Sequence, residues 1–177
     1  VPVPSGGCEY SKNCAANRFK DFDKSHWAHK AVDYAVDKGL MQGEGEDTFN
    51  PEGNLNRAMM AQILYNMEGK PAVSTESVFD DVAGDAWYAQ AIAWAAEKGL
   101  VNGYGDGRFD PEAPITREQL ATILYKYAKY KGYDVSVGED TNILSYNDFS
   151  EISEYAIPAI QWACGSGIMQ GRGSGYL

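Results

Sequence analysis

Two kinds of amphipathic helix recur along the chain, and the spacing of apolar positions predicts both. After Trp27, apolar and small residues return at helical intervals as far as Gly39, and residues 91–96 repeat this pattern before Gly99. A glycine directly after the last periodic residue is typical of a left-handed helix end. The second kind of helix has the i, i+3, i+4, i+7 stripe of a core-facing helix. Its apolar positions are Met60, Ile63, Leu64 and Met67, and then Leu120, Ile123, Leu124 and Tyr127.

The two helices of the second kind differ in how they are capped. Thr116 is followed three residues later by Gln119, the spacing of a capping box in which each side chain satisfies a backbone N–H. Asn56 can also accept from the first turn, but Met59 cannot complete the box. We therefore expect the helix after Thr116 to have the better start, by a few tenths to about 1 kcal/mol.

These helices belong to a repeat with a period of 60 residues. Between residues 19–65 and 79–125, 18 of the 47 aligned positions are identical without a gap. A third copy begins at Tyr146, places Asp148 opposite Asp21 and Asp81, and stops at Leu177. A single helix pair cannot bury its own apolar face in water, so the copies must pack on one another.

The predicted fold is therefore all-α, built from tandem helix-loop-helix repeats of which the third is truncated. The expected boundaries are a leader (residues 1–18), repeat 1 (19–69), repeat 2 (79–132) and the first half of repeat 3 (145–177). Cys8 and Cys14 bracket a short polar loop, so the leader is either a linker or a loop stapled by a disulfide. Cys164 lies in an apolar stretch and is expected to be a free core residue.

Composition and charge exclude several partners. The chain has 177 residues, is 44% hydrophobic and carries a formal net charge of -10. Nucleic acid and anionic membranes both attract basic faces, so we expect no nucleic-acid partner. No apolar run approaches the roughly 18 to 20 residues of a membrane span, and the first residues, VPVPSGG, lack the regions of a signal peptide. We expect no membrane insertion, and a mature extracellular fragment fits this start.

The order of motifs within each copy resembles the S-layer homology (SLH) module of bacterial cell-surface proteins. These motifs are F-x-D, Trp, a helix ending in Gly-Leu, a G-x-G turn, F-x-P, and T-R-E-Q before an apolar helix. The resemblance covers residues 19–177. It implies three modules in a pseudo-threefold bundle, with grooves that hold an anionic, commonly pyruvylated, wall polysaccharide. It also implies non-covalent anchoring at the cell wall of a Gram-positive bacterium, with no cofactor.

Two arginines stand at the position of the family signature T-R-A-E, which is T-R-E-Q from residue 116 and N-R-A-M from residue 56. An arginine in the first helical turn adds a planar, charged donor group where free backbone N–H groups already favour anions. Arg57 and Arg117 are therefore the leading candidates for binding a carboxylate. The alternative is that each arginine pairs with a nearby acidic residue and holds the turn.

Aromatic residues near the start of the first helices are further candidates. Trp27 and Trp87 can stack on a sugar ring or fill the core, and the sequence does not decide between these roles. Tyr155 takes roughly the same place in repeat 3, after an insertion.

Aspartates and glycines complete the candidate site. Asp21 and Asp81 can hydrogen-bond a sugar hydroxyl, although a turn or cap role suits them as well. Gly43 and Gly103 can let the backbone approach a neighbouring module or a ligand, and turn geometry alone also explains them.

Other chemistry has weaker support. Asp106, Asp110 and Glu112 miss the spacing of a calcium loop, and His26 and His29 have no third ligand, so no metal site is expected. Acidic residues are numerous, but a repeated pattern argues against an enzyme because a catalytic site is usually single. Two alternatives to wall binding remain: a protein-protein assembly module, or the anchoring part of an extracellular enzyme.

The third copy lacks the F-x-P corner, the arginine and the second helix. An apolar face left without these parts needs cover. We expect either further residues of a longer chain or a partner segment to complete repeat 3.

Overall fold

The computed structural model describes residues 13–73, 78–138 and 140–177, and these ranges contain helices and no β-strand. The α-helices are α1 (His29–Asp37), α2 (Arg57–Met67), α3 (Ala89–Glu97), α4 (Arg117–Tyr130) and α5 (Ile157–Gly165). The 3-10 helices are η1 (Ala15–Arg18), η2 (Phe149–Glu151) and η3 (Glu154–Ala156). The prediction of an all-α chain is confirmed.

The helix ends follow the local sequence signals. Thr116 and Gln119 form the complete capping box at the start of α4, whereas Asn56 caps α2 alone by accepting from the Met59 N–H. After α1 and α3 the chain turns through Gly39 and Gly99 with φ of 65° and 68°. Positive φ is the left-handed ending that the glycines predict.

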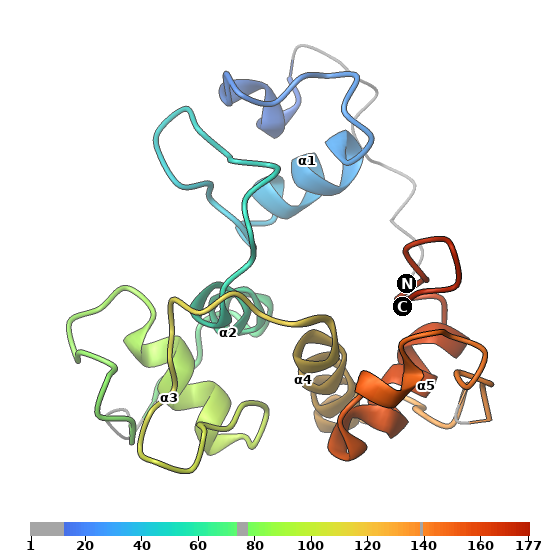
Figure 1. The fold of residues 1–177 in the computed structure, drawn as a ribbon. Helices are drawn as coiled ribbons and strands as arrows, with labels where there is room; N and C mark the ends of the chain where they lie inside the picture. Colours follow the sequence, from blue (N-terminus) through green and yellow to red (C-terminus); the bar gives the residue numbers. More distant parts are fainter. Residues whose placement is uncertain (1–12, 74–77, 139) are drawn as a thin grey trace.

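Three lobes surround a common centre, where α2 and α4 lie (Figure 1). The first lobe consists of η1 and α1, the second of α2 and α3, and the third of α4, η3 and α5. The second helix of each repeat therefore packs on the first helix of the next repeat. This confirms that the copies pack on one another, and it shows that the packing unit spans two repeats.

Each lobe has its own apolar cluster, and the clusters differ in size. The second lobe has the largest, with Ile92, Trp94 and Leu64 fully buried, and α4 joins it through Ile123 and Tyr127. The third lobe buries the opposite side of α4 against α5. The first lobe has a small cluster, whose buried residues are Ala16, Phe19, Phe22 and Val32.

The described part of the leader is a packed element of the first lobe. Ala16 is fully buried, and its N–H donates to Asp33 Oδ1 of α1 at 3.2 Å. Cys14 is buried and disulfide-bonded, while its expected partner Cys8 lies outside the described residues. Residues 14–18 are therefore packed in the first lobe, and the pairing of Cys14 with Cys8 stays a prediction.

Cys164 is the free cysteine of the described chain and lies half-buried beside the cluster of the third lobe. Burial raises the pKa of its thiol. None of the described helices is long and apolar enough to cross a membrane.

Candidate functional site

The aspartate of each F-x-D motif holds the corner that precedes the second helix. In repeat 1, Asp21 accepts hydrogen bonds from the backbone N–H groups of Phe49, at 2.9 Å, and Asn50, at 2.7 Å. These two bonds hold the pKa of Asp21 below its ordinary value. Asp81 repeats both bonds in repeat 2, and Asp148 accepts from the last residue of the chain in repeat 3. This position supports the turn role considered for Asp21 and Asp81.

Gly43 and Gly103 allow a close approach within their own repeats. A Cβ at Gly43 would lie 2.6 Å from the Phe19 ring, and one at Gly103 would lie 2.6 Å from the Phe79 ring. Gly43 also has a φ of 85°, which other residues rarely adopt. Packing inside the repeat therefore accounts for both glycines, and Gly43 additionally lines the groove described below.

Arg57 is buried and joins repeat 1 to repeat 2. Its Nε donates to the carbonyl of Phe109, and a terminal nitrogen donates to the carbonyl of Asn102, both at 2.8 Å. Its guanidinium lies 4.4 Å from the centre of the Phe109 ring. In the alternative to ligand binding, each arginine pairs with an acidic side chain and holds the turn. The partners of Arg57 are backbone carbonyls instead, but these hydrogen bonds also hold the turn.

The first turn of α2 has no free donor for an anion. The Arg57 N–H donates to the Ala113 carbonyl at 3.1 Å, and the Ala58 N–H donates to the Pro111 carbonyl at 2.9 Å. The next N–H is capped by Asn56. The N–H groups with which a helix N-terminus would bind an anion are therefore occupied in α2, two of them by carbonyls of repeat 2.

Arg117 occupies the same position on α4 but has different surroundings. It is exposed, one terminal nitrogen donates to the carbonyl of Gln170, and it makes no ion pair with any described residue. Within the described chain, the N–H groups of Arg117 and Glu118 donate to no other group. The start of α4 therefore has backbone N–H groups without a described acceptor, whereas the equivalent N–H groups of α2 are hydrogen-bonded to repeat 2.

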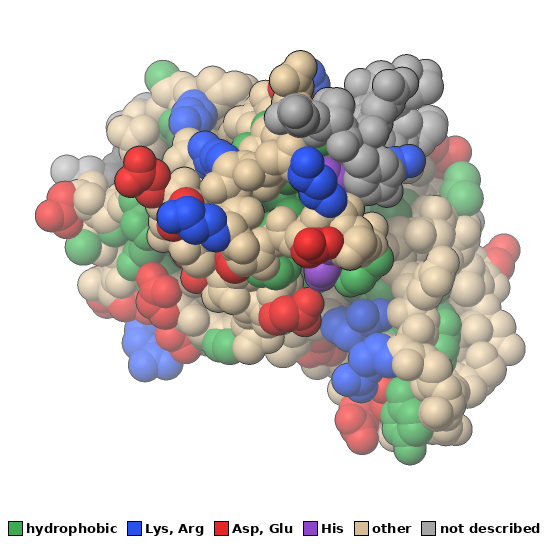
Figure 2. Space-filling view, turned by 90° about the horizontal axis from the view of Figure 1, so that it is seen from above, with side chains coloured by type: hydrophobic (Ala, Val, Ile, Leu, Met, Phe, Trp, Pro, Cys, Tyr) green, Lys and Arg blue, Asp and Glu red, His purple; other side chains and the backbone are tan. Residues whose placement is uncertain are grey.

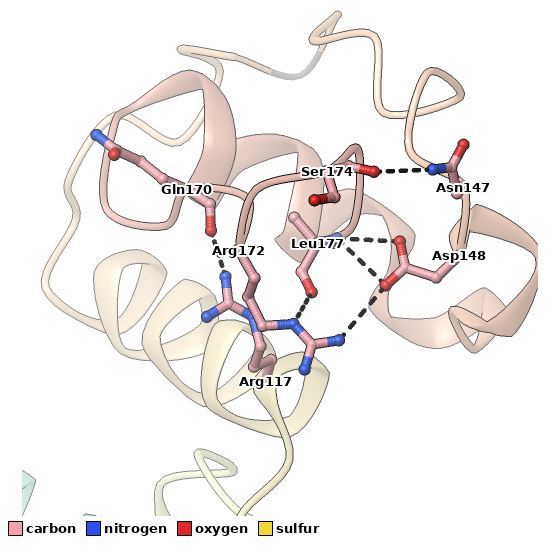
Figure 3. A network of polar contacts seen from close by, with 7 residues as sticks. All are labelled: Arg117, Asn147, Asp148, Gln170, Arg172, Ser174 and Leu177. Carbon is pink, nitrogen blue, oxygen red and sulfur yellow. Dashed lines mark hydrogen bonds and ion pairs between the residues drawn. The ribbon is translucent and has the colours of Figure 1, made fainter.

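A second arginine lies in the turn that Arg117 contacts. Arg172 comes two residues after Gln170, whose carbonyl accepts from Arg117, and Figure 3 shows both side chains. The Nε of Arg172 donates to the Leu177 carbonyl at 2.9 Å, and a terminal nitrogen lies 3.9 Å from Asp148. The sequence pattern does not single out Arg172, because the equivalent positions of repeats 1 and 2 hold a glutamate and a tyrosine.

Arg18 makes the corresponding contact in the first lobe. One of its terminal nitrogens donates to the carbonyl of Gln42, as Arg57 does to Asn102 and Arg117 to Gln170. Each turn that opens with a G-x-G motif is thus held by an arginine from a neighbouring element. Arg18 is not among the predicted site residues, although the pair Asn17-Arg18 matches Asn56-Arg57 and was the available signal.

A groove of about 700 Å³ lies where repeats 1 and 2 meet. Its walls come from the loop before α2 and from α2 itself, and Trp87 and Glu112 of repeat 2 complete it. Apolar side chains, among them Leu40, Phe49 and Ile63, line it together with polar ones. The polar side chains are Gln42, Glu44, Asn50, Asn54, Asn56, Gln62, Asn66, Lys70 and Glu112. A volume of this size is typical of small-ligand sites.

The two tryptophans are not core residues. Trp27 is 89% exposed and Trp87 is 60% exposed, so both present an indole face to solvent. Trp87 lines the groove, whereas Trp27 does not. Tyr155, in the related position of repeat 3, is also exposed, and its hydroxyl donates to Glu118 at 3.2 Å. The core role considered for Trp27 and Trp87 is thus excluded by their exposure, and the ligand role stays a prediction.

The surface charge does not form one basic face. Figure 2 shows acidic and basic side chains interspersed on the face seen from above. The formal net charge is -10. An anion therefore needs a local site, as at Arg117, because the molecule as a whole repels it.

No group of three metal-ligating side chains occurs among the described residues. The groove and the start of α4 instead offer hydrogen-bond donors, acceptors and one exposed indole. Such groups can hold a polar ligand without a metal.

Comparison with known proteins agrees with the internal repeat. A family model described as S-layer homology domain matches residues 18–61, 78–121 and 145–177. The chain is 31% identical over its whole length to an endoglucanase of Bacillus sp. (strain KSM-635), and it covers 18% of that protein. It is 31% identical over 161 residues, or 89% of the chain, to the surface-layer 125 kDa protein of Lysinibacillus sphaericus, of which it covers 13%. It is 33% identical over 97 residues, or 52% of the chain, to a cellulosome-anchoring protein of Acetivibrio thermocellus, of which it covers 22%.

Proposed function

The chain belongs to the S-layer homology domain family, and we propose that it anchors an exported protein to the bacterial cell surface. Relatives with this region include surface-layer proteins, an endoglucanase and a cellulosome-anchoring protein. Each relative is far longer than this chain, and what they have in common is the region that matches it. Anchoring is the role that we propose for this shared region.

We further propose that the ligand is an anionic, pyruvylated polysaccharide in the wall of a Gram-positive bacterium. The observation that carries this step is the start of α4, where Arg117 is exposed, lacks an acidic partner among the described residues and contacts the turn that carries Arg172. The N–H groups of Arg117 and Glu118, which donate to no described group, add to the positive end of the same helix. A pyruvate ketal carries a carboxylate, which a guanidinium can bind through two parallel hydrogen bonds.

Arg57 has a different part in this proposal. Because it is buried against the carbonyls of Asn102 and Phe109, it holds two repeats in register and does not contact the glycan. The carboxylate of Glu118, next to Arg117, already accepts from Ser153 and Tyr155. These contacts tie the Glu118 side chain to repeat 3.

We assign no catalytic role to the chain. The match to the endoglucanase covers 18% of that enzyme, and it consists of the repeat region. The repeated contacts at Gln42, Asn102 and Gln170 are hydrogen bonds from an arginine to a backbone carbonyl in each copy. In a longer parent protein, catalysis would belong to another region.

The test is co-sedimentation with purified cell-wall sacculi, followed by titration with the released polymer. Arg117→Gln is expected to weaken binding of the pyruvylated polymer by at least about tenfold, because it removes the charged partner of the carboxylate. Lys129→Gln is the matched control, since it removes one positive charge from the exposed far end of the same helix. It is expected to change binding by less than about twofold.

Two results would contradict this proposal. The first is unchanged sedimentation of the double variant Arg117→Gln, Arg172→Gln. The second is equal binding of the polymer before and after its pyruvate groups are removed. Concentration-dependent self-association without any polymer binding would favour the assembly module instead.

A further inference from the structure

We infer that Asn102 is a site of spontaneous deamidation, at which the side-chain amide is converted to a carboxyl group. Asn102 is the one asparagine of the chain that a glycine follows. Glycine has no side chain that would keep its backbone nitrogen away from the preceding side chain. The modification does not involve the cell-wall polymer, so it goes beyond the proposed function.

The three repeats provide an internal comparison at this position. Asn102-Gly103 of repeat 2 corresponds to Gln42-Gly43 of repeat 1 and to Gln170-Gly171 of repeat 3. In all three, the carbonyl of the first residue accepts from an arginine. Attack of the glycine nitrogen on an asparagine side chain closes a five-membered ring, whereas glutamine needs a six-membered ring, which forms more slowly. Repeat 2 therefore has the reactive residue.

Two cations contact the reacting groups of repeat 2. Arg57 donates at 2.8 Å to the main-chain carbonyl of Asn102, which belongs to the same peptide group as the attacking nitrogen. Lys126 Nζ lies 3.1 Å from the Asn102 side-chain oxygen, with the amide oriented so that its nitrogen donates to the Val101 carbonyl. The first contact makes the Gly103 N–H more acidic. The second stabilises the negative charge that develops on the side-chain oxygen during attack.

The second cation has no counterpart in repeat 1. Asn66 stands 60 residues before Lys126, and its uncharged amide donates to the Leu40 carbonyl. Within the described chain, the Gly103 N–H donates to no other group, so no hydrogen bond has to break before its nitrogen attacks. Asn102 is exposed, so water can reach the product of this attack.

The reaction replaces ammonia by water. The Gly103 nitrogen forms a bond to Cγ of Asn102, the Cγ–Nδ2 bond breaks, and its electron pair leaves with the nitrogen, which takes up the Gly103 proton as ammonia. The product is a succinimide ring, and water opens it at one of two carbonyl carbons. Addition at Cγ gives aspartate. Addition at the main-chain carbon gives isoaspartate, in which the chain runs through the side-chain carbon.

The two products differ in their effect on the contact between repeats 1 and 2. Aspartate keeps the main-chain carbonyl that accepts from Arg57 and adds a carboxylate beside Lys126. Isoaspartate lengthens the main chain by one carbon and displaces this carbonyl, so Arg57 retains only its bond to Phe109. Formation of isoaspartate therefore loosens the contact between the two repeats as the protein ages.

The experiment follows the mass of the full chain during incubation at pH 8, with peptide mapping to locate the change. Asn102 is expected to gain the mass difference between water and ammonia. Asn54 and Asn142, which are exposed and are followed by leucine and isoleucine, should stay unchanged. Lys126→Gln should slow the conversion at least about fivefold, because it removes a charge that stabilises the attack. Lys126→Arg is the matched control and should keep the rate within about twofold, since it keeps the charge.

Two further controls separate the folded contact from the local sequence. In urea the contact between Lys126 and Asn102 is lost, so Lys126→Gln should have no effect there. Asn102→Gln reproduces the residue of repeats 1 and 3 and should not convert over the same time. An unchanged rate in folded Lys126→Gln, the same slowing in urea, or faster conversion of another asparagine would overturn the inference.

The effect on the contact between repeats is measured on the separated isoaspartyl form. It should melt at a lower temperature than Asn102→Asp, which is the matched control because it has the new carboxylate and keeps the carbonyl that accepts from Arg57. Equal melting temperatures would show that isoaspartate does not loosen the contact.

Discussion

The first and second lobes use equivalent repeat positions in different ways. Ala31 of α1 is exposed, whereas its identical counterpart Ala91 of α3 is fully buried. The same contrast holds for Tyr34, which is 36% exposed, and Trp94, which is 1% exposed. Residues at equivalent positions of two repeats, 60 residues apart, can therefore have different environments. What decides burial is the element that packs across the helix.

The covering elements differ in length. The eleven residues of α2 cover α3, whereas the four residues of η1 cover α1. The first lobe also buries polar side chains, His29 and Asp33, within its small interior. The disulfide at Cys14 lies in this lobe. A cross-link is a common means of stabilising a small core.

The largest test of this contrast is a pair of truncations at equivalent positions. Trp94→Ala is expected to lower the free energy of unfolding by about 3–5 kcal/mol, because it leaves a cavity in a closed core. Tyr34→Ala should cost less than about 1 kcal/mol, since its ring is already partly in water. Urea denaturation of both variants measures the difference. Similar losses would mean that α1 is covered in solution as fully as α3.

The second test compares the repeated arginine contact in its buried and exposed forms. Arg57→Met should lower the free energy of unfolding by about 2–3 kcal/mol, because the carbonyls of Phe109, in a buried bond, and of Asn102, in a part-buried one, lose a charged donor. Arg18→Met should cost about 1 kcal/mol or less, since water can replace the exposed bond to Gln42. Thermal unfolding of both variants gives the comparison. A larger loss at Arg18 would show that the first lobe depends on this contact more than its burial indicates.

The third and smallest test concerns the link between α2 and α4. Glu68 accepts a hydrogen bond from the Tyr127 hydroxyl at 2.6 Å and another from Lys131 at 3.2 Å. These partners hold the pKa of Glu68 below its ordinary value of 4.5. Because the folded-state pKa is lowered, the stabilisation is fully present above about pH 4.5 and is lost as the pH falls through the folded value.

Glu68→Gln should therefore cost about 1 kcal/mol at pH 7, and the gap from the unchanged protein should close below pH 4.5. Unfolding free energies measured from pH 7 down to pH 3 check this. A gap that stays constant over this range would show that the charge of Glu68 does not contribute.

Local features of the fold could be predicted from the sequence, because they depend on residues close together in the chain. The capping box at Thr116, the single cap at Asn56 and the left-handed glycines at Gly39 and Gly99 all require only neighbouring residues. The pairing of α2 with α3 could not be predicted in detail. The apolar stripe shows that a helix needs cover, but it does not show which helix supplies it.

The candidate site was less predictable, because it too depends on contacts between residues far apart in the chain. Arg57 and Arg117 share a motif, yet Arg57 is buried against repeat 2, whereas Arg117 is exposed and contacts the turn that carries Arg172. Met67 belongs to the predicted core stripe but is 48% exposed, because no described element covers its side of α2. Long-range contacts decide these cases, and a repeat pattern does not contain them.

The arginine contacts at Gln42, Asn102 and Gln170 bear on how such chains can be recombined. Each contact joins the turn of one repeat to an element that precedes it, so a cut between repeats separates an arginine's helix from the turn it holds. A chimera should instead be joined in the loop between α1 and α2, or between α3 and α4. Such junctions would transfer whole lobes, and with them their cores, between anchoring proteins.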